Sequence, residues 1–292
     1  MPRTLPAPSD RSRGATRGRA ALQWPVPVRR AGPEEHDGRV TAPLASEKFQ
    51  AFTGQHWLLI GIFLIGLVVV IVRGRSHRGT PRERPIRRGY AVVLALAAVT
   101  MLVYYTVEPG GFRLGTSLPL ELCDLAEFTA VVALWTKSPR AAAFTYYVAL
   151  TLSIQAIVTP SLGQTFPSPR YFGFWTLHFL VVWAAAYLTW GLGFRPTWSL
   201  YRATLVATLV WALVAFPLNE VLDTDYGYLN RKPSSASLLD LLGPWPWYLV
   251  AAAAIIATGW ALVLTLPWTL AARRRAADPA AGQSARSTIT GA

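Results

Sequence analysis

Residues 57–72 read WLLIGIFLIGLVVVIV, and the following segment, 73–88, holds seven arginines and one glutamate. An apolar run of this kind approaches the length of about 20 residues that a helix needs to cross a bilayer. The basic cluster behind it marks the end of the span and favours the cytoplasmic side for that connection. This stretch therefore predicts a helical, integral membrane protein.

The rest of the chain repeats the pattern. Hydrophobic residues make up 52% of the sequence and charged residues 15%, and the charges gather in short clusters between long apolar runs. We expect an all-α fold, a polytopic membrane helix bundle with about seven transmembrane helices. The expected spans are roughly Trp57–Val72, Tyr90–Val107, Leu118–Trp135, Ala141–Thr159, Phe172–Gly191, Tyr201–Leu218 and Trp247–Trp268, and the first could borrow Phe52–His56 to reach full length.

The distribution of Lys and Arg predicts the orientation. The connection 73–88 and the cluster Arg273–Arg275 fall on one side of the expected spans, and the connections on the other side mix a few basic residues with acidic ones. By the positive-inside rule the basic side is cytoplasmic. We therefore expect a multi-pass protein of the cell membrane with its N-terminus outside and its C-terminus in the cytoplasm.

Composition divides the chain into three parts. Residues 1–50 are basic, rich in Pro, Arg, Ala and Gly, and lack apolar periodicity, so they are expected to form a disordered N-terminal tail. No apolar core of a signal peptide lies near Met1. Residues 51–270 form the expected seven-helix transmembrane domain, and 271–292 a disordered cytoplasmic tail.

The net charge of +13 could suggest a nucleic-acid partner. The arginines, however, flank membrane spans or lie in the tail, which is the pattern expected for topology and for contact with anionic phospholipids. We therefore expect membrane phospholipids, and no nucleic acid, as partners. A single cysteine excludes a disulfide within the chain, and one Cys with scattered His argues against a structural metal site. No Gly-rich phosphate loop is present, and we expect no cofactor.

Two residues of complementary chemistry lie at one depth of the expected bundle. Cys123 is about five residues inside the outer end of its span, and His178 is about six residues inside the outer end of another. At 1.5 Å per residue both lie roughly 8–9 Å below the outer surface. Each has a structural alternative, because a membrane cysteine often only fills space and a membrane histidine often only bonds a neighbouring helix.

Carboxylates surround the cysteine in the sequence. Glu127 lies about 40° from Cys123 on a helical wheel, Asp124 about 100° and Glu121 about 160°. A charge inside a membrane span is costly and usually functional, although each acid could simply pair with a cation or a carbonyl. A further polar run, which begins at Asn219, closes the sixth span on the same outer half.

Three polar segments stand out along the chain: Leu118-Pro-Leu-Glu-Leu-Cys123, Arg170-Tyr-Phe-Gly-Phe-Trp-Thr-Leu-His178 and Asp225-Tyr-Gly-Tyr-Leu-Asn-Arg-Lys-Pro233. They resemble the signature segments of the YwaF and transmembrane-protein-164 family of integral membrane proteins, and Gln55-His56-Trp57 is similar to the family's opening. The third segment departs from the family pattern, in which Asn and Met stand where this chain has Asp225 and Gly227. The resemblance extends over about residues 50–270.

The resemblance implies a multi-span fold and, from the eukaryotic branch of the family, acyl transfer between phospholipids through a Cys and a His. These residues map onto Cys123 and His178, the candidate catalytic pair. A nearby imidazole can deprotonate a thiol, which then attacks an ester and forms a thioester that a second alcohol resolves. We expect Glu127 to orient His178 through a hydrogen bond.

Further residues complete the candidate site. Asp124, Asn219, Asp225 and Tyr226 are expected to support it, and four cations at the outer mouth could hold a lipid phosphate. Two other classes stay open: a small-solute or ion transporter lined by the acids, and a non-catalytic membrane scaffold or receptor. A related lipid hydrolase would share the Cys/His pair. The four cations are Arg113, Arg170, Arg231 and Lys232.

Overall fold

The computed structural model describes residues 49–108, 112–233 and 237–277. All of them belong to one of the two units into which the chain divides, Leu44–Ala292, and the other unit, Met1–Pro43, lies outside the described residues. The described part is helical and contains no strand, which confirms the all-α prediction. The elements are α1 (Gly54–His77), α2 (Glu83–Val107), α3 (Leu114–Ser117), α4 (Leu122–Thr136), α5 (Pro139–Val148), η1 (Ala149–Ser153), α6 (Ile154–Val158), α7 (Pro169–Ala186), η2 (Tyr187–Gly191), α8 (Trp198–Leu222), η3 (Tyr226–Tyr228), η4 (Leu238–Leu242), α9 (Trp247–Gly259), η5 (Trp260–Thr265) and α10 (Leu266–Ala277).

Six helical segments of the described chain are long and apolar enough to cross a membrane. Three of them run through a π-helical turn without ending, so that α5, η1 and α6 form one segment, as do α7 with η2 and α9 with η5 and α10. The chain is therefore a multi-pass membrane protein. The six segments are Gly54–His77, Glu83–Val107, Pro139–Val158, Pro169–Gly191, Trp198–Leu222 and Trp247–Ala277.

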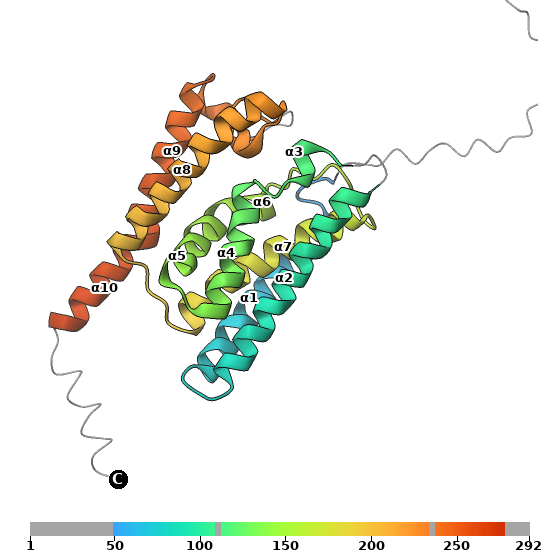
Figure 1. The fold of residues 1–292 in the computed structure, drawn as a ribbon. Coiled ribbons are helices and arrows are strands. Elements are labelled where there is room, and N and C mark those ends of the chain that lie inside the picture. The colour runs from blue at the N-terminus through green and yellow to red at the C-terminus, as the bar shows by residue number, and fades with distance from the viewer. Residues whose placement is uncertain (1–48, 109–111, 234–236, 278–292) are drawn as a thin grey trace, which may run out of the picture. The chain divides into compact units, whose positions relative to one another are not determined.

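One expected span, Leu118–Trp135, is not among these six segments. It corresponds to the shorter helix α4, of 15 residues. It packs against α2, α5 and α7 (Figure 1). Three alanines spaced along it, Ala126, Ala130 and Ala133, are fully buried, and small residues at such positions let neighbouring helices approach closely. At 1.5 Å per residue α4 is about 22 Å long. It can be short because other helices of the bundle surround it.

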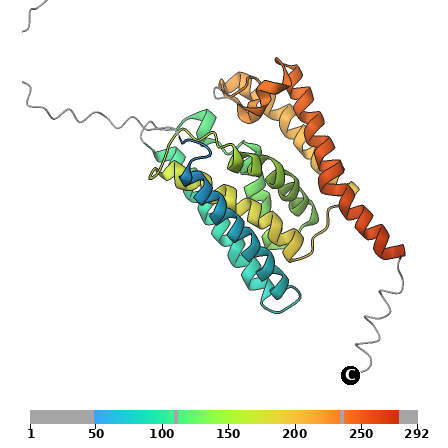
Figure 2. The same cartoon turned by 180° about the vertical axis from the view of Figure 1, so that it is seen from behind.

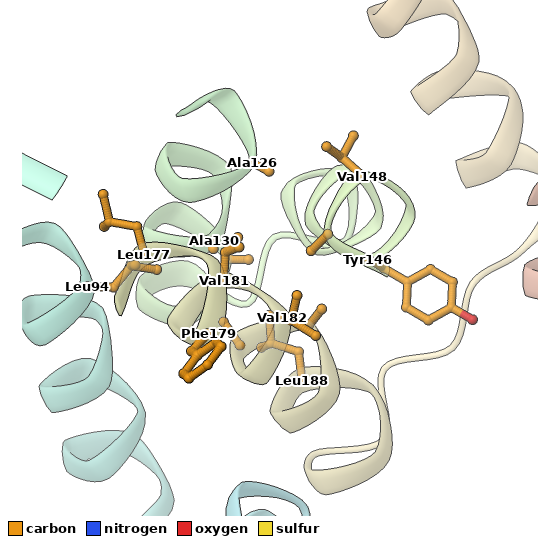
Figure 3. Packing of buried hydrophobic residues seen from close by; sticks show 14 of the residues in the cluster. Leu94, Ala126, Ala130, Tyr146, Val148, Leu177, Phe179, Val181, Val182 and Leu188 are labelled. Atoms are coloured by element: carbon orange, nitrogen blue, oxygen red, sulfur yellow. The ribbon is translucent and has the colours of Figure 1, made fainter. Parts of the chain in front are cut away.

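Burial separates central from peripheral segments. In the most apolar 18-residue stretch of α5–α6 and of α7–η2, 61% of the residues are buried. The corresponding share is 11% in α1, α8 and α9–α10. Figure 3 shows the centre, where Val181, Val182 and Leu177 of α7 lie among side chains of α2, α4 and α5. The peripheral helices expose large apolar side chains, such as Leu58 on α1 and Leu213 on α8. A surface of this kind suits lipid, because contiguous exposed apolar area is rare on soluble monomers.

Polar contacts join the basic ends of the helices. Arg75, near the end of α1, donates to the carbonyl of Trp190 at 3.1 Å, and Lys137 behind α4 pairs with Glu83 of α2 at 2.7 Å. Figures 1 and 2 show the α1–α2 connection at the same end as the end of α4. The basic connections after α1 and α4 thus lie at one end of the bundle, as the arginine pattern predicts.

The helical bundle extends beyond the expected boundary at each end. The last helix continues to Ala277 rather than ending at 270, because residues 271–277 are alanines and arginines, which are good helix formers, and basic residues in the last turn favour the helix dipole. At the other end, Phe49 is buried and packs against Tyr171 and Trp175 instead of belonging to the tail. Residues 1–48 and 278–292 lie outside the described part, so the predicted disorder there stays a prediction.

Candidate functional site

Cys123 is the second residue of α4, and its thiol is held by a hydroxyl. The Oγ of Ser153 donates to Sγ at 3.9 Å. Ser153 is fully buried and is the last residue of the π-helical turn η1. Such turns occur mostly as local bulges and often at functional sites. The bulge places a hydroxyl donor where it can stabilise negative charge on the sulfur.

His178 lies midway along α7 with its proton on a defined nitrogen. Its Nδ1 is 2.8 Å from the carbonyl oxygen of Phe174, one turn earlier in the same helix. A carbonyl can only accept, so Nδ1 carries the hydrogen and Nε2 keeps a lone pair. The ring also packs on Phe174, with centroids 4.3 Å apart. No hydrogen bond within the described residues occupies Nε2, which leaves it available as a base.

His56, near the start of α1, is different. It is fully buried, and both ring nitrogens are used: Nδ1 accepts from the amide of Phe52, and Nε2 donates to the carbonyl of Ile157, each at 2.8 Å. The neighbouring Gln55 donates to the hydroxyl of Tyr171 at 3.0 Å. These residues therefore fasten the start of α1 to α6 and α7, and His56 has no nitrogen left for catalysis.

The chain neighbours of Cys123 and His178, which are Asp124 and Leu177, line one small cavity between α2, α4 and α7. The elements that carry Cys123, Ser153 and His178, which are α4, η1 and α7, also pack against one another in all three pairings. No hydrogen bond joins the thiol to the imidazole within the described residues. The direct pair therefore stays a prediction, while its two members belong to neighbouring helices.

The expected hydrogen bond from Glu127 to His178 is absent from the described part of the chain. The carbonyl of Phe174 already occupies Nδ1 of the histidine, so the ring is oriented by its own helix. Glu127 instead lines the cavity with Asp124 and residues of α2, and only 5% of it is exposed. Asp124 accepts from the amide of Glu121 at 3.0 Å and thereby caps α4.

Asn219, in the last turn of α8, is the hydrogen-bonding centre of the polar loop that follows the helix. Its amide nitrogen donates to the carbonyl of Tyr226 at 3.1 Å and to Oδ1 of Asn230 at 2.8 Å. Its Oδ1 accepts from the hydroxyl of Thr224 at 2.9 Å and from the amide of Tyr226 at 2.8 Å. Asn219 is 1% exposed, and its hydrogen-bonding groups are all satisfied. It supports the loop and has nothing left to offer a ligand.

The loop reaches the segment that leads into α4. The amide of Gly227 donates to Oε2 of Glu121 at 3.0 Å, and the indole of Trp211 on α8 donates to the carbonyl of Leu120 at 2.9 Å. The hydroxyl of Tyr226 bonds the carbonyl of Leu114. The first and third signature segments are thus joined directly, and the loop braces the residues immediately before Cys123.

The two departures from the family pattern have clear local consequences. Asp225 accepts through Oδ1 from the amides of Asn230 at 3.1 Å and Arg231 at 3.2 Å, contacts that an Asn side-chain oxygen could also make. Burial raises the pKa of Asp225, and these two amides oppose the shift. Gly227 has a φ of 69°, and a Cβ there would lie 2.2 Å from Cη2 of Trp211. Glycine is therefore required at this position in this chain.

Of the four cations expected at the outer mouth, three are occupied by carboxylates. Arg170 makes a two-point contact with Glu108 and lies over the ring of Tyr105 at 5.1 Å. The guanidinium of Arg170 lowers the pKa of Glu108. The remaining pairs are Arg231 with Asp223 at 3.4 Å and with Asp225 at 3.9 Å, and Lys232 with Asp240 at 3.8 Å.

Arg113 is the exception. It is exposed and forms no ion pair with any described residue. The other three cations each have an acidic neighbour within reach, and the binding of a lipid phosphate by the four stays a prediction. No group of three or more His, Cys, Asp or Glu residues in the described part could hold a metal ion.

Sequence reasoning did not identify Ser153 or Glu108. Ser153 is a single hydroxyl within an apolar span, and its partner Cys123 lies 30 residues away in the chain. Glu108 follows α2 directly, and Arg170 lies 62 residues further on. The rarity of polar residues inside spans could have singled out Ser153 as a candidate partner. No local signal identifies the Glu108–Arg170 pair.

Comparison with known proteins places the chain. Residues 51–264 match the model of the TMEM164 family, and this match covers most of the chain and nearly all of its described part. The chain belongs to that family. Searches of the curated proteins and of the solved structures gave no match.

Proposed function

We propose, from its membership of the TMEM164 family and the arrangement around Cys123, that this protein transfers a fatty acyl group between phospholipids. The observation that carries the proposal is that a thiol with a hydroxyl donor and an imidazole with no hydrogen bond to Nε2 in the described part lie on helices that pack against each other. Ser153 donates to Sγ of Cys123, and His178 holds its hydrogen on Nδ1, which leaves Nε2 as the base.

In the first step Nε2 of His178 takes the thiol proton as Sγ of Cys123 attacks the ester carbonyl of a phospholipid. The carbon–sulfur bond of a thioester forms, the ester carbon–oxygen bond breaks, and the imidazolium returns its proton to the leaving lysophospholipid oxygen. The hydroxyl of Ser153 stabilises the thiolate by a hydrogen bond. Resting distances in such pairs are often long and shorten when the substrate binds.

In the second step a lysophospholipid hydroxyl attacks the thioester. Nε2 of His178 accepts the hydroxyl proton, the new ester forms, and the departing sulfur of Cys123 recovers the proton. If water attacks the thioester in place of the lysophospholipid, the product is a free fatty acid. The lipid hydrolase considered from the sequence would therefore use the same steps with water as the acyl acceptor. Arg113, which has no carboxylate partner in the described part, is positioned by the connection before α4 to attract the lipid phosphate.

The test is to trap the acyl-enzyme. Purified protein in phospholipid vesicles that carry a tagged acyl chain is expected to label at Cys123 with a bond that hydroxylamine cleaves. Cys123→Ala should not label, and His178→Ala should label far more slowly. His77→Ala, which changes a histidine at the end of α1, serves as the matched control and should behave as wild type. Full acyl transfer by Cys123→Ala would exclude the thiol mechanism and favour a scaffold.

The proposed orientation has the N-terminus outside and the C-terminus in the cytoplasm, which would put Cys123 in the outer half of the membrane. The seven arginines of 73–88 support it, because basic connections stay in the cytoplasm. In a Cys123→Ala background, Ser76→Cys should be protected from impermeant thiol reagents in intact cells. Labelling from outside would invert the topology and move the thiol to the inner leaflet.

A further inference from the structure

A small cavity between α2, α4 and α7 has apolar walls with a few polar side chains, and the acyl-transfer chemistry does not use it. Its volume is about 50 Å³. Met101 and Tyr105 of α2, Asp124 and Glu127 of α4, and Leu177 of α7 contribute to its walls. A water molecule needs roughly 10–15 Å³ of such space, so the cavity has room for about three to five.

Glu127 is the unusual member of the wall. It is 5% exposed, and its carboxyl group has no hydrogen-bond donor within the described residues. A buried carboxylate without a donor or a countercharge is costly enough that such groups are usually neutralised. The oxygens of Glu127 therefore need a partner that the described side chains do not supply, and the cavity is where that partner can lie.

The charged and titratable groups around Glu127 do not provide that partner. On α4 itself, Asp124 caps the helix and adds a second acid. From α2, Tyr105 faces the cavity, and the arginine stacked on it, Arg170, is already paired with Glu108. From α7, His178 donates to the carbonyl of Phe174.

The remaining neighbours of α4 offer only hydroxyls that are already engaged. Thr145 of α5 bonds Thr129 of α4 at 3.1 Å, and Ser153 of η1 bonds Cys123. No cation in the described part contacts Glu127. The described acids, histidines and cysteine also form no cluster of three that could hold a metal ion, which argues against a bound cation as the occupant.

We propose that this cavity is a proton-binding site, in which Glu127 is held as the neutral acid and exchanges its proton with water in the cavity. Leu118 and Pro119, in the connection before α4, also line the cavity. The exchange route therefore runs toward the end of the bundle where α4 begins. The proposal is independent of acyl transfer, because it uses neither the sulfur of Cys123 nor the base of His178.

Infrared spectroscopy of the purified full chain in lipid nanodiscs tests the site. At neutral pH the wild type should show the carbonyl stretch of a protonated carboxylic acid, and the band should shift in heavy water as the proton exchanges. Glu127→Gln should remove the band. Glu108→Gln is the matched control and should keep the band, because Arg170 lowers the pKa of Glu108 and that carboxylate is ionised at neutral pH. Absence of the band in wild type, or its persistence in Glu127→Gln, would overturn the proposal.

Two further measurements keep the test decisive if Glu127→Gln does not fold. Labelling the side-chain carboxyl of glutamate with carbon-13 should shift the frequency of the wild-type infrared band. The same labelling of aspartate should leave the frequency unchanged. Ala98→Val adds methyl groups to the cavity wall, so the band should remain while its deuterium exchange slows by about tenfold or more, since water must then enter by local opening. The spectra are recorded in choline chloride buffer and again in sodium chloride buffer. If the band disappears in sodium, the cavity binds a cation, and the proposal that it binds a proton is contradicted.

Discussion

Asn219 and Glu127 are both polar, both inside helices and both almost completely buried, with 1% and 5% of their surface exposed. The side chain of Asn219 donates two hydrogen bonds and accepts two, all with residues of the loop that follows α8. Glu127 satisfies none within the described residues and faces a cavity. Buried polar groups are normally fully paired, so the unpaired one is the better candidate for a functional role. Burial alone does not separate them.

The largest expected effect is at Asn219. Asn219→Ala leaves the amide and carbonyl of Tyr226 and the hydroxyl of Thr224 without partners in a buried loop. We expect a loss of about 3–4 kcal/mol of stability, because each buried unpaired group costs roughly 1–3 kcal/mol and such costs are not additive. For a domain of this size the melting temperature in detergent should fall by roughly 6–16 °C.

A matched variant sharpens this test. Asn219→Asp keeps both accepted hydrogen bonds but cannot donate to Tyr226 or Asn230. Its melting temperature should lie between those of wild type and Asn219→Ala. A melting temperature of Asn219→Ala within about 2 °C of wild type would show that the loop does not depend on this residue.

The next effect is expected where the same loop passes under Trp211. Gly227→Ala places a methyl group 2.2 Å from Cη2 of Trp211 at a φ of 69°, which suggests a cost of about 1–3 kcal/mol. Gly89→Ala in α2 is the control, because nothing lies within 4 Å of its added Cβ, and it should be neutral or stabilising by up to about 1 kcal/mol. Differential scanning fluorimetry of both variants measures the difference. Equal behaviour would mean that the glycine is not required.

Glu108 offers a third contrast, since it is a buried glutamate that does have a partner. The bond from Arg170 lowers the pKa of Glu108 in the folded state. The pair therefore stabilises the fold above the unfolded pKa of about 4.3, and this contribution disappears as the pH falls through the lower folded value. Removing it at neutral pH should cost about 1–2 kcal/mol.

Glu108→Gln supplies the measurement. Its melting temperature should be lower than that of wild type at neutral pH, and the two should converge as the pH is lowered below about 4. Unequal melting temperatures that persist into strong acid would indicate a steric rather than an electrostatic role. Glu108→Asp, which keeps the charge but shortens the side chain, controls for the geometry of the two-point contact with Arg170.

The helix bundle could be predicted from the sequence because the signals for membrane spans lie in short, continuous stretches of the chain. The length of an apolar run fixes a span, and the positions of arginines fix the ends, so the all-α multi-pass fold follows without knowledge of any contact. The residue at which α4 begins is predicted less accurately than the spans themselves. Pro119 lies within the apolar run, and Asp124 caps the helix that begins at Leu122, so α4 is shorter than the run predicts.

The site could be predicted only in part, because its contacts are long-range. The family motifs identify Cys123 and His178, and the structure places the helices that carry them side by side. The motifs do not identify the donor to the sulfur, Ser153, which depends on a π-helical turn that no propensity marks. Nor do they show that Arg170 is already paired, since its partner Glu108 is far away in the chain.

The smallest expected effect on stability is at Glu127. If its carboxyl is neutral and bonded only to water in the cavity, Glu127→Gln exchanges one neutral polar group for another of nearly the same shape. The melting temperature should therefore change by no more than about 2 °C, which corresponds to less than about 1 kcal/mol. Glu127→Ala should cost more, because it enlarges the cavity and removes contacts of the side-chain methylenes. A fall of more than about 5 °C in Glu127→Gln would mean that the carboxylate is ionised and that its charge is matched. In that case Glu127 would be a structural residue like Asn219, and the contrast between the two would fail.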